Sequence, residues 1–292
     1  MNQLEFGLGL QSDKPLEEYA RLGRRAEELG FDVVTVYADL MFQPPLPALL
    51  AIAEATERVR IGPSCLNPFT VHPVEIAGQT AVLDAASRGR AFLGLARGAW
   101  LDALGLDTAR PVTAIREAVE IVRRLLAGDA SGFAGERFSL APGVALRYDV
   151  LRPSVPLLIG TWSPRLAAYA GAEADELKVG GSANPALVPI MRERIGAREV
   201  GLVFGAVTVC DADGERARRV ARAEAAMYLD VVARLDPTVE GEPILDRFAF
   251  AGTPDEIGAQ VEALRHAGVS RIDFGTPHGS LELLGEVVRA FA

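Results

Sequence analysis

The chain has little cysteine, little histidine and no excess of positive charge, and each shortage excludes a class of function. It holds two cysteines, Cys65 and Cys210, and three histidines. These form no CxxC pair and no Cys/His cluster, so a metal site is not expected. The formal net charge is −9 without any basic stripe. A nucleic-acid partner is therefore not expected either, because phosphate contacts need lysine and arginine.

Long apolar segments are also missing. The first residues, MNQLEFGLGL, have no charged region ahead of an apolar stretch, so a signal peptide is not expected. The longest apolar runs have the length of a strand and are broken by glycine or charge, which predicts no membrane-spanning helix. With so few cysteines, we expect a cytoplasmic protein. We also expect a small-molecule substrate and no membrane partner.

Strand-like and helix-like segments alternate along the whole chain. Hydrophobic residues make up 49% of it, which is enough to fill a large core. Buried strands are expected at 4–10, 31–37, 59–65, 91–96, 155–160, 175–179, 200–209 and 271–274. Helices are expected at 15–29, 46–56, 72–86, 112–126, 164–171, 185–195 and 215–234, from Thr253 onward, and at 280–291.

Eight such strand–helix units predict a single-domain α/β protein, a (β/α)8 TIM barrel. Two segments break the rhythm: an irregular excursion near 128–153 with one hairpin, and a covering loop near 236–250. The alternative is an open doubly wound sheet. Its GxGxxG fingerprint is incomplete after the first strand, where the sequence 7–12 is GLGLQS.

Chemistry in such a barrel takes place on the loops that follow the C-terminal ends of the strands. Tyr37 and Asp39 follow the second strand and His278 follows the eighth, where each can supply a proton or a hydrogen bond. Asp39 can equally be a solvated loop acid. Cys65, at the end of the third strand, is expected to be a small buried hydrophobe and not a nucleophile.

Two turns on neighbouring strands are typical of phosphate binding. In the sequences 160–164 (GTWSP) and 180–185 (GGSANP), a capping residue precedes a proline at the first helical position. The free N–H groups of such a helix start can hold a phosphate, and ordinary capping is the alternative. Arg97 and Gly98 follow the fourth strand, where a guanidinium and a bare backbone can approach a planar ligand.

Several stretches resemble the bacterial luciferase-like superfamily. They include 61–69 (IGPSCLNPF), 89–95 (GRAFLGL), 252–256 (GTPDE) and 283–287 (LLGEV), and the likeness runs over nearly the whole chain. Within the superfamily the chain is most similar to the deazaflavin-dependent branch, above all to the methylenetetrahydromethanopterin reductases. The resemblance implies a luciferase-like barrel, often a homodimer, that binds coenzyme F420.

The resemblance also implies where the cofactor binds. A bulge at the end of the third strand is expected to carry a non-prolyl cis peptide bond beneath the deazaflavin ring, which by position joins Ser64 to Cys65. The implied cofactor-binding residues are Ser64, Cys65, Leu66, Asn67, Arg97, Gly98, Gly160, Thr161, Trp162, Gly180, Gly181 and Asn184.

The chain departs from this pattern at acidic and histidine positions. Relatives often carry an Asp-His pair where this chain has Ala38 and Asp39, and an acid where it has Ala99; the reductases have an acid in place of Gly9. The resemblance thus implies an F420-dependent oxidoreductase acting on an activated C=C, C=N or C=O bond and not on methanopterin. The alternatives are an FMN-dependent monooxygenase and a non-catalytic flavin or deazaflavin binder.

Overall fold

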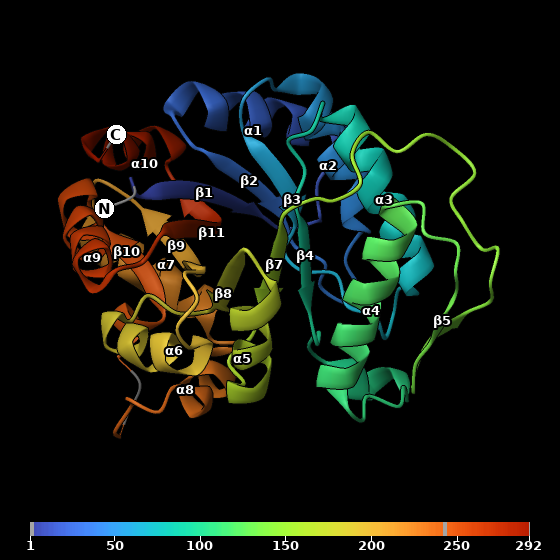
Figure 1. Ribbon diagram of the computed structural model, residues 1–292. Helices are drawn as coiled ribbons and strands as arrows, with labels where there is room; N and C mark the ends of the chain where they lie inside the picture. Colours follow the sequence, from blue (N-terminus) through green and yellow to red (C-terminus); the bar gives the residue numbers. More distant parts are fainter. Residues whose placement is uncertain (1–2, 242–243, 292) are drawn as a thin grey trace.

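In the computed structural model, which describes residues 3–241 and 244–291, eight parallel strands stand around one axis (Figure 1). In chain order they are β1 (Glu5–Leu10), β2 (Val33–Val36), β3 (Arg60–Pro63), β4 (Leu93–Ala96), β7 (Leu157–Gly160), β8 (Glu176–Gly180), β9 (Gly201–Cys210) and β11 (Arg271–Gly279). Their order in the sheet is β3-β2-β1-β11-β9-β8-β7-β4. Parallel bridges between Ile61 and Ala91 and between Leu66 and Leu95 join the two outer strands. The predicted barrel is confirmed, and the open sheet is excluded.

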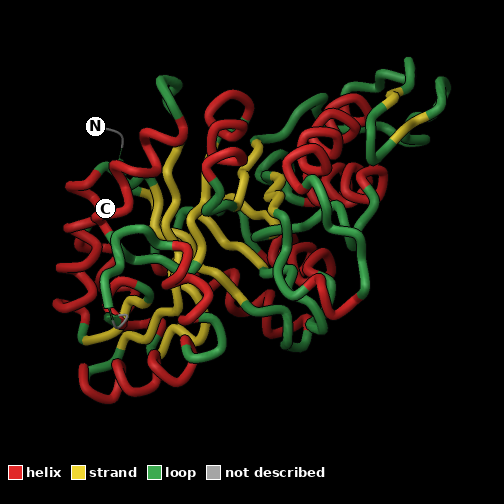
Figure 2. Tube along the Cα trace, turned by 90° about the horizontal axis from the view of Figure 1, so that it is seen from below, coloured by secondary structure: helices red, strands yellow, loops and turns green. Residues whose placement is uncertain are grey.

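Helices surround the strands on the outside, as Figure 2 shows with the strands in yellow and the helices in red. None of the described helices is long and apolar enough to cross a membrane. The helices that follow the barrel strands are α1 (Leu16–Leu29), α2 (Pro45–Ala55), α3 (Pro73–Ala86), α4 (Pro111–Leu126), α5 (Pro164–Glu173), α6 (Val188–Ile195), α7 (Gly214–Ala225), α8 (Leu229–Leu235), α9 (Pro254–Ala267) and α10 (Leu281–Ala290). Short 3-10 turns occur at Leu101–Leu104, Pro185–Leu187 and Leu245–Arg247.

Capping residues fix where these helices start and stop. The Thr253 hydroxyl accepts the Glu256 N–H while the Glu256 carboxylate accepts the Thr253 N–H, a complete capping box at the start of α9. Gly30 ends α1 in the left-handed conformation, with φ 93°, which glycine adopts without steric cost. The expected start of α9 and end of α1 are both confirmed.

The strands separate two layers of apolar packing. Outside the barrel, Phe6 stacks on Phe274 with ring centroids 5.8 Å apart, within the large core between strands and helices. Inside the barrel a smaller cluster fills the axis, formed by Val33, Phe92, Leu158 and Val203. Because side chains alternate between the two faces of a strand, this inner cluster identifies which residues of each strand point toward the axis.

The excursion near 128–153 lies outside the barrel beside α3 and α4 (Figures 1 and 2). It contains the one expected hairpin, made of β5 (Phe133–Ala134) and β6 (Ser139–Leu140). The Glu117 carboxylate of α4 accepts the N–H groups of Glu136, Arg137 and Phe138, at 2.6 to 2.9 Å. These bonds attach an otherwise irregular segment to the barrel.

Two expectations for the segment after β9 were wrong. The helix expected at 215–234 is broken between α7 and α8, because Tyr228 turns inward and packs with Val232 over Gly181. The covering loop expected up to residue 250 ends in a strand, β10 (Ala249–Gly252), since this apolar run pairs with the free edge of the second half of β9. Residues 242–243 of that loop lie outside the described residues.

Candidate active site

Glycine lines the inner face of the barrel where the parallel strands end. Six strands have glycine at the inward position near their C-terminal ends: Gly9, Gly94, Gly160, Gly180, Gly205 and Gly275. A Cβ at Gly9 would collide with the Tyr37 hydroxyl, and one at Gly160 would lie 3.0 Å from Cys65 Sγ. A Cβ at Gly180 would meet no atom of the described chain within 4 Å. Open space at the mouth therefore lies above Gly180, whereas the other five glycines let neighbouring atoms of the chain pack closely against the backbone.

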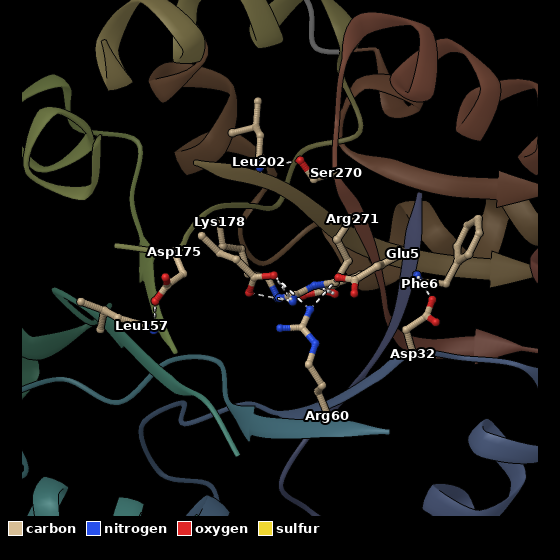
Figure 3. A network of polar contacts seen from close by, with 12 residues as sticks. Glu5, Phe6, Asp32, Arg60, Leu157, Asp175, Lys178, Leu202, Ser270 and Arg271 are labelled. Atoms are coloured by element: carbon tan, nitrogen blue, oxygen red, sulfur yellow. Dashed lines mark hydrogen bonds and ion pairs between the residues drawn. The ribbon is translucent and has the colours of Figure 1, made fainter. Parts of the chain in front are cut away.

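A buried network of charged side chains lies directly below this bed of glycine backbone (Figure 3). Lys178 Nζ donates to Ser64 Oγ at 2.8 Å and to Asp273 Oδ2 at 2.7 Å. Arg271 Nε donates to the other Asp273 oxygen at 2.9 Å, and Arg271 Nη1 donates to both oxygens of Glu176 at 2.8 Å. The network joins β3, β8 and β11 inside the barrel.

Opposite charges keep this network ionised. Burial alone would raise the pKa of Asp273, but Arg271 and Lys178 outweigh it and hold that pKa below its usual value. Burial likewise opposes the charge on Arg271, and the Asp273 and Glu176 carboxylates reverse the effect and raise its pKa. Removing one member of such a buried set leaves its partner uncompensated, which costs several kcal/mol.

None of the charged residues of this network was among the site residues predicted from the sequence. Its residues lie two apart on two strands, as Glu176 and Lys178 on β8 and as Arg271 and Asp273 on β11. Alternating charges in a strand that is otherwise apolar indicate a polar inner face. That signal is present in the sequence, where 175–179 and 271–274 were predicted only as buried strands.

The expected cis peptide bond joins Ser64 to Cys65, as the resemblance implied. The Ser64 hydroxyl is held by Lys178, and Cys65 lies against Gly94 and Gly160 at the ends of β4 and β7. Burial raises the pKa of the Cys65 thiol to about 11. Cys65 is therefore a neutral thiol at neutral pH, as expected, and not a nucleophile.

Tyr37 and Asp39 follow β2, the strand next to β3, so they lie across the mouth from β8 and Lys178. The Tyr37 hydroxyl occupies the space left by Gly9 and Gly275, and its ring centroid lies 5.8 Å from Lys178 Nζ. Asp39 accepts a hydrogen bond of 3.1 Å from Gln11 Nε2. Burial raises the pKa of both groups, and for Asp39 the Gln11 bond and the Lys178 charge partly offset that rise. Asp39 can exchange a proton or a hydrogen bond with a bound molecule, and the neutral Tyr37 hydroxyl can exchange a hydrogen bond.

His278 is buried in an extension of β11 and does not lie on a free loop. Its Nε2 lies 2.9 Å from the Gly9 carbonyl oxygen and 3.2 Å from that of Phe274. Carbonyl oxygens only accept, so Nε2 carries the proton and donates it to the backbone. Burial lowers the pKa of His278 to about 4. These contacts connect β1 to β11 and favour a structural role over the expected catalytic one.

The first predicted phosphate turn leaves the start of α5 open. The Thr161 hydroxyl accepts the Ser163 N–H at 2.9 Å, and the Trp162 indole donates to the Gly180 carbonyl at 2.9 Å. Within the described residues, the Ser163 side chain makes no capping bond to α5. The N–H groups of the first turn of α5 can therefore still take an anion.

The second predicted phosphate turn is occupied by the protein itself. Asn184 Oδ1 accepts the Ala186 N–H at 3.1 Å, while Nδ2 donates to Asp236 at 2.8 Å and to Thr238 at 2.7 Å. The Gly181 N–H is bonded to the Gly205 carbonyl. Asn184 thus secures the segment after α8, and ordinary capping, the alternative to the expected phosphate contact, is what the structure has here.

The remaining predicted residues shape the loops after β3 and β4. Leu66 exchanges backbone hydrogen bonds with β4, and Asn67 Oδ1 accepts the N–H groups of Phe69 and Thr70 at 3.1 and 3.0 Å. Gly98, with φ 86°, packs against Asn67 in a conformation that favours glycine. Arg97 is exposed at the rim, where its guanidinium can reach a ligand.

A cavity of about 410 Å³ lies at the opposite end of the barrel, where β4 and β7 begin. Two arginines on its wall are already paired: Arg123 with Glu173 at 2.7 Å, and Arg152 with Asp84 at 2.7 Å. Chemistry in this fold occurs at the other end of the strands, so the glycine-lined mouth is the candidate active site. Within the described residues no His, Cys, Asp and Glu side chains gather in a group that could hold a metal ion.

Comparison with known proteins agrees with this geometry over the whole chain. The chain is 26% identical to 5,10-methylenetetrahydromethanopterin reductase of Methanopyrus kandleri, over 99% of this chain and 98% of the relative. It is 28% identical to F420-dependent glucose-6-phosphate dehydrogenase of Amycolatopsis mediterranei, over 90% and 89% of the two chains. The structure of an F420-dependent secondary alcohol dehydrogenase with an F420–acetone adduct has the same fold, with a TM-score of 0.84, 20% identity and full coverage of both chains.

The family comparison covers most of the barrel. The model of the luciferase-like monooxygenase family matches residues 3–271, from the start of β1 to the start of β11. The chain therefore belongs to the luciferase-like monooxygenase family.

Proposed function

We propose that this chain is an F420-dependent oxidoreductase that transfers a hydride between the deazaflavin and a small or medium-sized organic substrate. Relatives along its full length are described as F420-dependent dehydrogenases and as methylenetetrahydromethanopterin reductases. The observation that carries the proposal is the open space over Gly180 at the mouth, two residues beyond Lys178, which donates a hydrogen bond to Ser64. A flat tricyclic ring fits this space, because glycine lets a planar ligand approach the backbone.

The residues present can hold this cofactor. Ser64 and Cys65 form one side of the bed, and Gly160 and Gly180 form the other. The uncapped start of α5 can take the phosphate of the cofactor tail, and Arg97 stands at the rim. When bound, the deazaflavin supplies a hydride donor or acceptor at its C5 carbon.

The chain's own part in the reaction is to orient the hydride donor and acceptor and to exclude water. Tyr37 and Asp39 are the titratable groups at the mouth that can give a hydrogen bond or a proton to the substrate. Orientation of donor and acceptor can by itself contribute about 7 kcal/mol or more to lowering a barrier. A substrate whose double bond is already activated by conjugation needs few acids, which agrees with Ala38 and Ala99 at positions where relatives carry polar residues.

Cofactor binding tests the proposal and separates it from its alternatives. The purified chain is titrated with oxidised and reduced F420 and with FMN, and retention is measured by absorbance after gel filtration. We expect F420 to bind. Binding of FMN alone would support the monooxygenase reading. Binding of reduced F420 that no enone, imine or ketone acceptor then oxidises would support the non-catalytic alternative.

A matched pair of variants locates the site. Gly180→Leu fills space that is empty of protein, and Gly258→Leu does the same on α9, where a Cβ also meets nothing within 4 Å of the described chain. We expect both variants to fold and only Gly180→Leu to lose F420 affinity, by at least tenfold. Equal affinity in the two variants would place the cofactor elsewhere.

The homodimer and the cytoplasmic location stay predictions. Exposed apolar side chains of α3 and of the neighbouring excursion, Val82, Tyr148 and Leu151, support an interface on that side. Native mass spectrometry measures the oligomeric state directly, and a single mass of one chain at micromolar concentration would contradict a dimer.

A further inference from the structure

Lysine is rare in this chain, and one of its two lysines is buried under the mouth. Lysine and arginine together number 30, of which only Lys14 and Lys178 are lysines. Lys14 lies in the loop after β1, whereas Lys178 is 6% exposed on the inner face of β8. A chain that uses arginine almost everywhere has a compact ammonium with three donors at this one interior position.

The charges inside the barrel alternate in sign along one series of ion pairs, and Figure 3 shows the cluster that they form. From the base of the barrel to the mouth, the bonded series runs Glu5, Arg60, Glu176, Arg271, Asp273 and Lys178. Three acids and three bases cancel, so the series is neutral as a whole. Its order still matters, because the series begins with an acid at the base and ends with a cation at the mouth.

The ammonium of Lys178 faces the groups expected to touch the cofactor. Two of its N–H bonds are used by Ser64 and Asp273, and the Tyr37 ring lies 5.8 Å away. Two further side chains feel its charge: the Asp39 carboxylate across the mouth and the Cys65 thiol. Gly180, two residues on along the same face of β8, leaves the space above Lys178 open. The remaining ammonium proton can therefore be directed toward a molecule in that space.

We propose that Lys178 is a positioning residue that fixes the Ser64 hydroxyl and, through its charge, makes the mouth bind the anionic form of an acidic ring system. This rests on the proposed function, since the ring in question is the deazaflavin. Asp39 carries the opposite charge on the other side of the mouth, so the two side chains act on the ring in opposite directions. Tyr37 and Cys65 are neutral at neutral pH because burial raises the pKa of each.

Absorbance titration of the bound cofactor tests this inference. The acidic groups of the deazaflavin ring change its absorbance when they ionise, so the pKa of the bound ring can be read at saturating protein. A nearby cation favours the anion, and Lys178→Met is expected to raise that pKa by about one unit, a tenfold change in the ionisation equilibrium. Asp39→Asn is expected to lower it. Lys14→Met, which removes the other lysine charge, is expected to leave it within a few tenths of a unit.

A second measurement does not depend on the stability of Lys178→Met. With ¹³Cε-labelled lysine the native chain gives two side-chain signals, assigned with Lys14→Met, and we expect F420 to displace the Lys178 signal more than the Lys14 signal. Suppose that F420 binds to the native chain, that binding does not displace the Lys178 signal, and that Lys178→Met leaves the pKa of the bound ring unchanged. The inference is then wrong while the proposed function stands. If F420 does not bind to the native chain at all, the proposed function itself fails.

Discussion

Replacing His278 with glutamine tests whether this buried histidine is structural or catalytic. Glutamine can place an amide nitrogen where the imidazole Nε2 donates to the Gly9 carbonyl, but it does not titrate. Burial lowers the pKa of His278 to about 4, from 6.5 for an exposed histidine. As the pH falls, the unfolded chain therefore takes up this proton first. Stability from this group is complete above about pH 6.5 and is lost as the pH falls toward 4, by about 3 kcal/mol in all.

Urea unfolding at a series of pH values measures this loss. The other two histidines, His72 and His266, are exposed and are replaced by glutamine in both proteins, so that only His278 differs. Carboxylates titrate in both proteins and cancel in the difference. We expect the protein with His278 to lose about 3 kcal/mol more than His278→Gln between pH 7 and pH 4. Parallel curves would refute the assignment of a buried, neutral imidazole.

The activity of the same variant decides the second half of the question. A general acid or base contributes about 10²- to 10⁴-fold to the rate, so a catalytic His278 would cost at least that in kcat when replaced. A structural His278 predicts a loss below tenfold at pH 7, once the protein is folded. A large fall in kcat with unchanged F420 affinity would restore the catalytic role that the sequence suggested.

Two further predictions concern the two cysteines and the buried charged network. Burial raises the thiol pKa of Cys65 to about 11 and that of Cys210 to about 12, so iodoacetamide at pH 8 should label both cysteines far more slowly in the folded protein than in urea, as peptide mass spectrometry would show. Cys65 is only partly buried, so rapid labelling of folded Cys65 would contradict its raised pKa. Arg271→Met leaves Glu176 and Asp273 without their shared partner and should lower the free energy of unfolding by about 3–5 kcal/mol. The control, Arg58→Met at an exposed position, should change the free energy of unfolding by less than about 0.5 kcal/mol. Equal effects of the two variants in urea unfolding would show that the network contributes no stability.

The sequence predicted the barrel well because its signals are local. Apolar runs of strand length alternate with amphipathic helices, and capping residues such as Gly30 and Thr253 mark helix ends within a few residues. The excursion was recognised from its glycines and prolines. The break between α7 and α8 was not predictable in this way, because it depends on Tyr228 packing over Gly181, a contact between residues far apart in the sequence.

The site was predicted less completely, for a similar reason. The sequence shows which residues follow the strand ends. Whether their polar atoms already form hydrogen bonds within the protein depends on the tertiary structure. Asn184 and His278 have suitable chemistry and location, yet the protein itself takes up their hydrogen bonds. Lys178 lies in the middle of a strand, where a charge is not expected, and only the space made by Gly205 and Gly7 for its ion pair explains its burial.

The missing acids on the loops and the buried charges below the bed have a common physical consequence. The family resemblance implies polar residues at three positions where this chain has Ala38, Ala99 and Gly9. Its ionised groups are instead held on β8 and β11, inside the barrel, where low dielectric strengthens their field and water cannot screen it. A charge placed there acts on a ring lying on the bed more than on a substrate stacked above it. The proposed function and the Lys178 inference together predict a chain that tunes its cofactor through Lys178 and leaves activation of the substrate mainly to the substrate's own electronic structure.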